Sequence, residues 1–397
     1  MNLHKEAWRF PALLLLTVLA NIGMGIVMPV LPIYFKQYDV SVAALSVPYA
    51  TLVLGRLCSR AFSPAAIMRW GHRRAVMAAF LLYALVFAAY LGAGSLAQFG
   101  MLRFIEGLVE GVLAIALNDL AIGYVRGVDS QQRVRLMGRF GSAFGLGFLL
   151  GPLAGAAIAH WLGLQAIFVA GALVGLLAML LAGVALAPVA ARAGHAGPRP
   201  ALGMLLALYS PQSLRRVLFF SLMILLPLHV TGALGMEASR VGMFFAASAV
   251  LTTLLMPLAG HVSQRIGQTA LIDGGLWFMG AALLLMGLVQ APLGFAALFV
   301  LETVAFALML PPAMALFSTA VEDHPERARV MGSMAFATEL LSLPPAFLLP
   351  ALYAYRPVLG WAAVAVLCLA TLWAGRRARH HLAPAFSAAH LTKEERI

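Results

Sequence analysis

Charged side chains inside long apolar runs are the residues of this sequence best suited to chemistry. Within the run 97–121, Arg103, Glu106 and Glu110 fall at positions i, i+3 and i+7, which share one face of a helix. The arginine can neutralise Glu106 in a permanent ion pair, which leaves Glu110 without a cation on its own helix. Apolar surroundings disfavour the charged form of a carboxyl, so such a group can exchange a proton near neutral pH. All three residues are candidates for proton coupling, and Glu110 is the first choice for the proton site.

Three further charges lie near the middle of apolar runs, at Arg56, Glu302 and Glu339. Each costs roughly 2.5–3.5 kcal/mol at a helix centre, so these side chains should pair with one another or face water. Glu302 and Glu339 are therefore further candidates for proton coupling. Arg56 could pair with any of the buried glutamates, or it could bind an anionic group of a substrate. Arg60 lies close enough to the end of its run to snorkel to the interface, and we assign no role to it.

A second set of side chains could line the path of a substrate. These candidates are Asn21, Tyr34, Tyr49, Arg56, His229 and Trp277. Aromatic rings can offer an apolar or cation-binding surface, although aromatic residues in membrane spans mostly pack. A lone histidine such as His229 is more often a satisfied core residue than a proton relay.

The composition places the chain in a lipid bilayer. Of its 397 residues, 62% are hydrophobic and 11% are charged, and the mean hydropathy is +0.92. This leaves too little polar surface to cover a water-soluble globule. The net charge of +12 is spread as short basic clusters between apolar runs, which is typical of orientation signals and not of nucleic-acid binding.

No sequence pattern indicates a cofactor, a metal or an enzyme. A G-x-x-x-x-G-K-[ST] phosphate loop is absent, because none of the lysines follows a glycine. No HExxH, G-x-S-x-G or paired Cys/His pattern occurs, and Cys58 and Cys368 have neither disulfide nor metal spacing. Any transport must run downhill or on an ion gradient, unless a separate ATPase subunit drives it.

The apolar runs predict an all-α membrane protein with twelve transmembrane helices. About 20 residues cross a hydrocarbon core of ~30 Å. Such runs are expected at 10–35, 43–66, 75–95, 97–121, 137–160, 164–188, 214–234, 240–262, 270–290, 293–318, 330–353 and 357–375. They form two six-helix bundles, 1–188 and 214–376, joined by a cytoplasmic Gly/Pro/Arg-rich linker at 189–213 and followed by a basic cytoplasmic tail at 377–397.

Basic residues are concentrated in the loops of one side. These are Arg69, Arg73, Arg74, Arg126, Arg133, Arg135, Arg192, Arg199, Arg215, Arg216, Arg265, Arg327, Arg329, Arg376, Arg377 and Arg379. The opposite side carries only Lys36, Arg240 and Arg356. By the positive-inside rule, both termini are cytoplasmic.

Two segments repeat between the halves. The stretch PAAIMRWGHRR, which begins at Pro64, corresponds to GHVSQRIGQ, which begins at Gly260. Likewise, RVRLMG, ending at Gly138, corresponds to RARVMG, ending at Gly332. Two six-helix bundles related by duplication are the expected build of an alternating-access carrier, with the substrate path between them.

A glycine stretch in the fifth run predicts close helix packing. Gly147 and Gly151 are four residues apart and therefore share one helix face, which Gly155 extends by another turn. Pro152 removes a helix hydrogen-bond donor beside them. This pattern is typical of a packing seam, and it also matches a signature described below.

These features together resemble the major facilitator superfamily over essentially the whole chain. The signature loop of that family after helix 2 reads G-x-L-a-D-R-x-G-R-R. The matching gating-loop residues of the two copies are Arg69, Gly71, Arg73, Arg74, Gly260, Arg265 and Gly267. Pro64 replaces the first glycine, His72 takes the first closing arginine position, and Met68 and Gln264 stand where each copy should carry Asp. The resemblance implies that this Asp latches the halves in the outward-facing state, so the usual latch lacks its acid here.

Another acid lies near the same loop. Asp119 is toward the cytoplasmic end of the fourth run. We expect it to pair with Arg73 or Arg74 rather than with a substrate.

Two motifs point to one branch of the family. RFIEG at 103–107 resembles an R-x-x-Q-G motif whose arginine is implicated in proton transfer, with Glu106 in place of Gln. GFLLGPLAG, with Gly147, Gly151, Pro152 and Gly155, is similar to the motif associated with antiporters. The opening run, with MPVLP, fits the twelve-helix drug:proton antiporters.

The resemblance implies a monomeric, proton-coupled antiporter of the bacterial inner membrane that exports a small amphiphilic compound. Protons, the small-molecule substrate and the lipid bilayer would be its partners. Two alternatives stay open. One is uptake of a small, possibly anionic, metabolite by symport or facilitated diffusion, with Arg56 and Arg103 binding the anion. The other is a receptor or scaffold that transports nothing.

Overall fold

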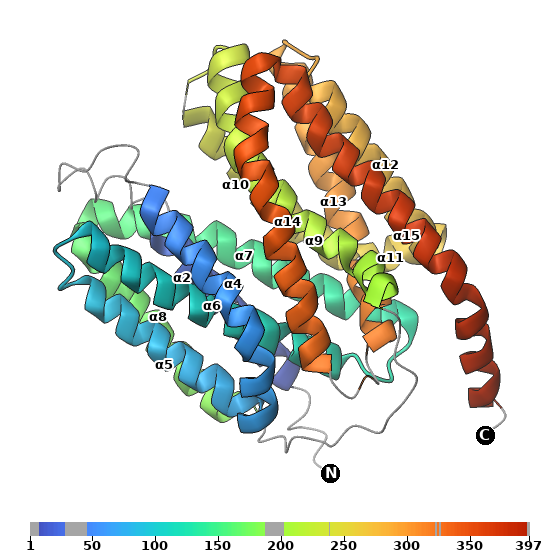
Figure 1. Cartoon of the computed structure of the whole chain (residues 1–397), viewed down its shortest axis with the longest axis horizontal. Helices are drawn as coiled ribbons and strands as arrows, with labels where there is room; N and C mark the ends of the chain where they lie inside the picture. The colour runs from blue at the N-terminus through green and yellow to red at the C-terminus, as the bar shows by residue number, and fades with distance from the viewer. Residues whose placement is uncertain are drawn as a thin grey trace. The chain divides into compact units, whose positions relative to one another are not determined.

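The computed structural model describes residues 8–27, 46–186, 202–237, 239–321, 324 and 327–394. Within these residues every regular element is a helix (Figure 1). The first part of the chain forms α2 (Arg9–Val27), α4 (Ser46–Trp70), α5 (His72–Tyr90), α6 (Leu96–Tyr124), α7 (Ser130–Leu162) and α8 (Leu164–Ala185). The second part forms α9 (Leu202–Leu228), the π-helical turn η2 (His229–Ala233), α10 (Ser239–Leu255), the 3₁₀ turn η3 (Met256–Leu258), α11 (Ala259–Ile266), α12 (Gln268–Met286), α13 (Pro292–Val321), α14 (Arg327–Tyr355) and α15 (Pro357–Glu394).

In the part of the chain that the structure describes, 8 helical segments are long and apolar enough to cross a membrane. The helices α4, α6, α9 and α14 are not among them, and α4, α6 and α14 carry most of the buried charges. The prediction of a helical, multi-pass chain is confirmed. Twelve spans and cytoplasmic termini stay predictions.

One face of α8 suits an environment of lipid. Leu173, Leu177, Leu180 and Val184 recur at helical spacing and are all more than half exposed, between 58% and 77%. A soluble protein rarely leaves such a continuous apolar stripe in water. The same stripe is stable against hydrocarbon tails, since it leaves no backbone polar group unsatisfied.

The described chain divides into two compact units. Unit 1 comprises Met1–Val128, Arg139–Gly197 and Val321–Leu340. Unit 2 comprises Asp129–Gly138, Pro198–Ala320 and Leu341–Ile397. Each unit therefore holds most of one half of the sequence, together with a short segment from the other half.

In unit 1, α4 and α6 cross at two glycines. A Cβ atom added to Gly55 would collide with the backbone of Phe104, and one added to Gly107 would collide with the backbone of Leu52. Only glycine permits such a close approach of two helix backbones. The crossing brings Arg56, which follows Gly55 on α4, next to Glu110, which lies one turn beyond Gly107 on α6.

The core of unit 1 near this crossing is aromatic. Tyr90 stacks on Phe99 and Phe168, with ring centroids 5.4 and 5.2 Å apart, and Phe87 meets Tyr90 edge-on. Offset-stacked and edge-on pairs are the favourable arrangements of aromatic rings. This packing fixes the Tyr90 hydroxyl beside α6.

The short exchanged segments explain the repeated RxRxMG motif. In unit 2, Gly138 of α7 lies against Pro257 of η3, whereas in unit 1, Gly332 of α14 lies against Pro64 of α4. Both glycines end the motif. The duplicated sequence thus makes duplicated contacts, each of them a glycine against a helical segment that contains a proline.

Unit 2 is built on a large apolar cluster. Helices α9, α12, α13 and α15 contribute most of it, with Phe295, Phe299 and Trp361 fully buried at its centre. Glu302 lies on α13, two turns beyond Phe295 on the same helix face.

Candidate functional site

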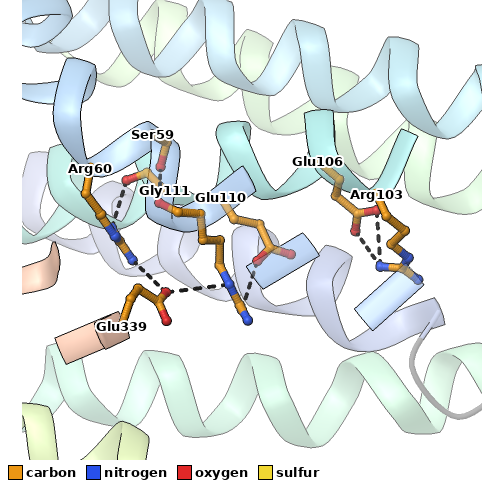
Figure 2. A network of polar contacts seen from close by, with 8 residues as sticks. Ser59, Arg60, Arg103, Glu106, Glu110, Gly111 and Glu339 are labelled. Atoms are coloured by element: carbon orange, nitrogen blue, oxygen red, sulfur yellow. Dashed lines mark hydrogen bonds and ion pairs between the residues drawn. The ribbon is translucent and has the colours of Figure 1, made fainter. Parts of the chain in front are cut away.

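Four charged side chains from three helices of unit 1 form a buried cluster (Figure 2). Arg56 of α4 reaches Glu110 of α6 with Nη1 to Oε2 at 3.3 Å, and its Nε lies 3.6 Å from Oε1 of Glu339 on α14. Glu339 also lies 3.5 Å from Nη2 of Arg60. We call Arg56, Arg60, Glu110 and Glu339 the ion-pair cluster.

The α4–α6 crossing explains why the cluster forms. Arg56 follows Gly55, and Glu110 lies one turn after Gly107, so the tight approach of the two helices leaves both side chains in one layer. Glu110 has no cation on its own helix at this point, as the spacing indicates, and α4 supplies one. Glu110 and Arg56, whose partners the sequence did not determine, therefore pair with each other.

The structure corrects the interpretation of Arg60. This side chain does not snorkel to the interface but is only 5% exposed. Its Nη1 donates to the backbone carbonyl of Gly111 at 3.0 Å, and its Nη2 faces Glu339. The helix pattern of α4 alone could not reveal this role, because both partners come from other helices.

Arg103 and Glu106 form the ion pair that their spacing predicts. Arg103 Nη1 donates to both carboxylate oxygens of Glu106 at 3.1 Å, and both residues are buried. The hydroxyl of Tyr90 donates to Glu106 Oε2 at 2.7 Å. In Figure 2 this pair lies apart from the ion-pair cluster. Both oxygens of Glu106 are thus bonded within one helix and its neighbour, as in a structural contact, whereas Nε and Nη2 of Arg103 are buried without a hydrogen-bond partner among the described residues.

The structure overturns the prediction that Asp119 pairs with Arg73 or Arg74. Its carboxylate instead meets Nε2 of His72 at 2.5 Å and pairs with Arg327, the first residue of α14. Gly71 turns the chain with a φ of 77°, and this turn directs His72, the first residue of α5, toward α6. His72, which stands at an arginine position of the loop motif, thus contacts Asp119. The arginine that pairs with Asp119 is Arg327 of α14.

The second gating loop has the same turn. Gly267 has a φ of 93° and ends α11 before α12 begins. Gly260 lies against the side chain of Arg135, within unit 2. Arg265 is in the last turn of α11.

The glycines of the antiporter-like motif form a packing seam with α2. A Cβ atom at Gly147 would meet Asn21 and Val18, one at Gly151 would meet Ile22 and Gly25, and one at Gly155 would meet Ile26. This confirms that the seam packs α7 closely within the first half of the sequence. Pro152 takes part by lying against Gly25.

In unit 2, His229 is a packed residue with partners. It begins the η2 turn, is buried, and stacks on Phe295 at 4.9 Å. Its Nδ1 lies 3.1 Å from the hydroxyl of Tyr353 and 3.2 Å from Nε1 of Trp361. These contacts agree with the more common role of a lone histidine, that of a core residue, although its Nε2 is buried without a hydrogen-bond partner among the described residues.

Glu302 is buried in a different environment. It is 4% exposed, and the hydroxyl of Thr303 lies 3.2 Å from its Oε2. No cation forms an ion pair with Glu302 among the residues that the structure describes.

The remaining path candidates lie in varied places. Asn21 is buried and donates from Nδ2 to the carbonyl of Thr17 at 2.7 Å. Trp277 is 54% exposed on α12, next to Phe278. Tyr34 and the side chain of Tyr49 lie outside the described residues.

A family model and a curated relative match the first half of the chain. Residues 13–220, just over half of it, match the model of the Major Facilitator Superfamily. Over 159 residues the chain is 23% identical to Multidrug resistance protein 2 of Bacillus subtilis (strain 168). This match spans 40% of the chain and 39% of that relative, so it covers less than half of either protein.

Solved structures match nearly the whole chain. The transporter FucP, in the outward conformation, has a TM-score of 0.77 at 14% identity and covers 94% of this chain and 99% of its own. The human organic anion transporter MFSD10 (TETRAN) has a TM-score of 0.72 at 19% identity, with 93% and 99% covered. A bacterial homologue of the iron transporter ferroportin, in the outward-facing state, has a TM-score of 0.70 at 14% identity, with 93% and 98% covered. At these identities the likeness concerns the fold. With the family model matching over half of its length, the chain belongs to the major facilitator superfamily of membrane transporters.

Proposed function

We propose that this protein is a proton-coupled antiporter of the bacterial inner membrane, which exports a small amphiphilic compound by alternating access. It would work as a monomer, with both termini in the cytoplasm. The observation that carries the proposal is the ion-pair cluster, in which two buried arginines meet two buried glutamates. The antiporter-like glycine seam and the relative named as a multidrug resistance protein support the same direction of transport.

The charge balance of the cluster suggests how exchange could work. As an ionised set, the two arginines and two glutamates sum to zero. A proton bound to Glu110 or Glu339 would give the cluster a net positive charge and weaken its hold on Arg56. A cationic amphiphile would then be repelled, whereas loss of the proton would favour its binding. Substrate and proton would therefore exclude each other, which is the requirement for antiport.

The cluster also joins helices from both halves of the sequence. Arg56 and Glu110 come from α4 and α6, and Glu339 comes from α14. Breaking a buried ion pair by neutralising one partner costs about 3–5 kcal/mol. That energy is large enough to shift a two-state equilibrium, so protonation could be coupled to a change in how α14 contacts α4.

The test uses purified protein in proteoliposomes with an imposed pH gradient and the fluorescent amphiphilic cation ethidium as probe. We expect gradient-driven ethidium flux that an uncoupler abolishes. Glu110→Gln should remove the response to the gradient. Asp273→Asn should leave it unchanged, because Asp273 forms an exposed pair with Arg376. If Glu110→Gln supports flux at the wild-type rate, Glu110 is not the proton site.

A second function is favoured by the arginines themselves. Arg56 and Arg60 converge on one carboxylate, Glu339, and an anionic substrate group could take its place. The protein would then take up a small anionic metabolite by symport or facilitated diffusion. Comparing Arg56→Gln with wild type on ethidium and on the anionic dye fluorescein separates the two functions. Selective loss of fluorescein flux would support uptake of an anion, and selective loss of ethidium flux would support export.

A further inference from the structure

Glu302 differs from every other buried acid in the described part of the chain. Glu106 contacts Arg103, Glu110 contacts Arg56, Glu339 contacts two arginines, and Asp119 contacts Arg327 and His72. Glu302 is also buried, at 4% exposure, yet the hydrogen-bond partner that the structure gives it is the neutral hydroxyl of Thr303. Unit 2 therefore contains a carboxyl with no countercharge among its described residues.

An ionised carboxylate in such a place is costly. Burying a charge without a partner costs far more than burying a neutral hydrogen-bonding group, and the group usually binds a proton instead. In lipid-surrounded helices, such residues usually mark proton or ion pathways. The neighbours of Glu302 should therefore suit a neutral carboxyl as well as a charged one.

The hydroxyls around Glu302 meet that requirement. Thr303 Oγ1 lies 3.2 Å from Glu302 Oε2 and 3.5 Å from Ser248 Oγ on α10. A hydroxyl has one proton to donate and two lone pairs, so Thr303 cannot donate to both neighbours at once. With Glu302 ionised, Ser248 donates to Thr303, which donates to Glu302. With Glu302 protonated, the direction reverses along the same three oxygens.

The chain of hydroxyls also leads outward. Glu302 and Thr303 are buried, at 4% and 1% exposure, whereas Ser248 is only partly buried. From α15, the titratable side chain near Glu302 is the buried thiol of Cys368. Neither this thiol nor the two hydroxyls can supply a positive charge.

We propose that Glu302 is a second proton-binding site, in unit 2, which gains and loses its proton through Thr303 and Ser248 during transport. The carboxylate takes up one proton to become a neutral carboxylic acid and releases it again. In each direction Ser248 and Thr303 each accept one proton and pass on another, so that both hydroxyls are regenerated and only the protonation state of Glu302 changes. The inference rests on the proposed function in one respect, namely that transport is coupled to protons. It adds a binding site outside the ion-pair cluster.

The first experiment needs no substrate. Infrared spectra of the full-length protein in lipid, recorded across a range of pH, report the carbonyl band of protonated carboxyl groups. We expect a band at neutral pH that loses the contribution of one carboxyl group in Glu302→Gln and is unchanged in the control Asp273→Asn. Thr303→Val should keep the band, because the carboxyl remains, and should slow its exchange in deuterated buffer. An unchanged neutral-pH band in Glu302→Gln would overturn the proposal.

The second experiment measures ethidium in proteoliposomes in two modes. Glu302→Gln should lose gradient-driven flux to the level of protein-free liposomes while it keeps ethidium exchange without a gradient. Retained exchange shows that the variant is folded. Thr303→Val should slow gradient-driven flux only. Wild-type gradient response in Glu302→Gln would overturn the second site and leave the proposed function standing. If wild-type protein shows no gradient-driven flux, the proposed function fails, while the infrared result still decides whether Glu302 binds a proton.

Discussion

At the scale of single residues, the two groups of buried charges in unit 1 differ in how their partners are arranged. Glu106 receives two bonds from Arg103 and one from Tyr90, whose ring itself stacks on Phe99 and Phe168. All of these groups come from the first half of the sequence. The ion-pair cluster, in contrast, includes Glu339 from the second half. We therefore assign the first pair to stability and the second group to transport.

Removing Arg103 should destabilise the protein more than removing a surface arginine. Arg103→Met leaves Glu106 buried without its cation, which costs about 3–5 kcal/mol. The double variant Arg103→Met, Glu106→Gln should recover most of this loss. Thermal unfolding of the detergent-purified proteins measures both effects.

The matched control is Arg376→Met, because the guanidinium of Arg376 pairs with Asp273 at 2.8 Å in an exposed position. Such surface pairs contribute about 0–1 kcal/mol. Equal losses in Arg103→Met and Arg376→Met would contradict a structural role for the buried pair.

The sequence could predict the contacts of the buried charges only between residues of the same helix. The Arg103–Glu106 pair follows from i, i+3 spacing, which fixes neighbours on one helical surface. Partners on different helices follow from packing, which no spacing encodes. For this reason the sequence left Arg56 with several possible partners, missed Arg60, and assigned Asp119 to the wrong arginines.

At the scale of helices, glycines determine which elements approach closely. Gly55 and Gly107 bring α4 onto α6, and the seam of α7 packs on α2. The seam was predictable because its glycines recur at helical spacing. The α4–α6 crossing was not predicted, although Gly107 and Gly111 of α6 have the same four-residue spacing and both face α4, because that spacing does not tell which helix packs against it.

Filling the α7 seam should prevent α2 from packing. A Cβ atom at Gly155 would overlap the backbone of Ile26, which cannot move aside as a flexible side chain can. Gly155→Val should therefore lower the unfolding temperature, with overpacking costs of typically 1–3 kcal/mol. Gly274→Val is the control, because a Cβ atom at Gly274 of α12 meets no atom within 4 Å. If both variants unfold alike, close packing at the seam is not needed.

The role of the repeated RxRxMG segments became clear only from the fold. Their similarity predicted a duplication, and the structure shows what is duplicated. Each segment lies in the unit formed mainly by the other half of the sequence, with Gly138 against Pro257 and Gly332 against Pro64. A motif that contacts the opposite half cannot be placed from its own periodicity.

At the scale of the whole molecule, composition and hydropathy were enough to predict a helical membrane protein, because burial in lipid constrains every span in the same way. The internal repeat and the resemblance to the family predicted a transporter. The family match confirms this class. The division into bundles at 1–188 and 214–376, with a linker between them, stays a prediction. Residues 189–201 of the linker lie outside the described residues, and residues 202–213 are not an irregular linker but form the beginning of α9.

The orientation of the chain in the membrane gives the last prediction. Basic residues gather in alternate loops, and the loop at 125–129 carries Arg126 whereas the loop at Gly163 carries no charge. Short loops that carry lysine or arginine stay in the cytoplasm, since these residues resist translocation when they lie near a span. We therefore expect alkaline phosphatase fused after Gly163 to be active and the same enzyme fused after Gly127 to be inactive. Green fluorescent protein should show the reverse pattern, because it folds in the cytoplasm, and it should also fluoresce when fused after Ile397. Active phosphatase at Gly127 or Ile397 would contradict the orientation and, with it, the direction of proton-driven export.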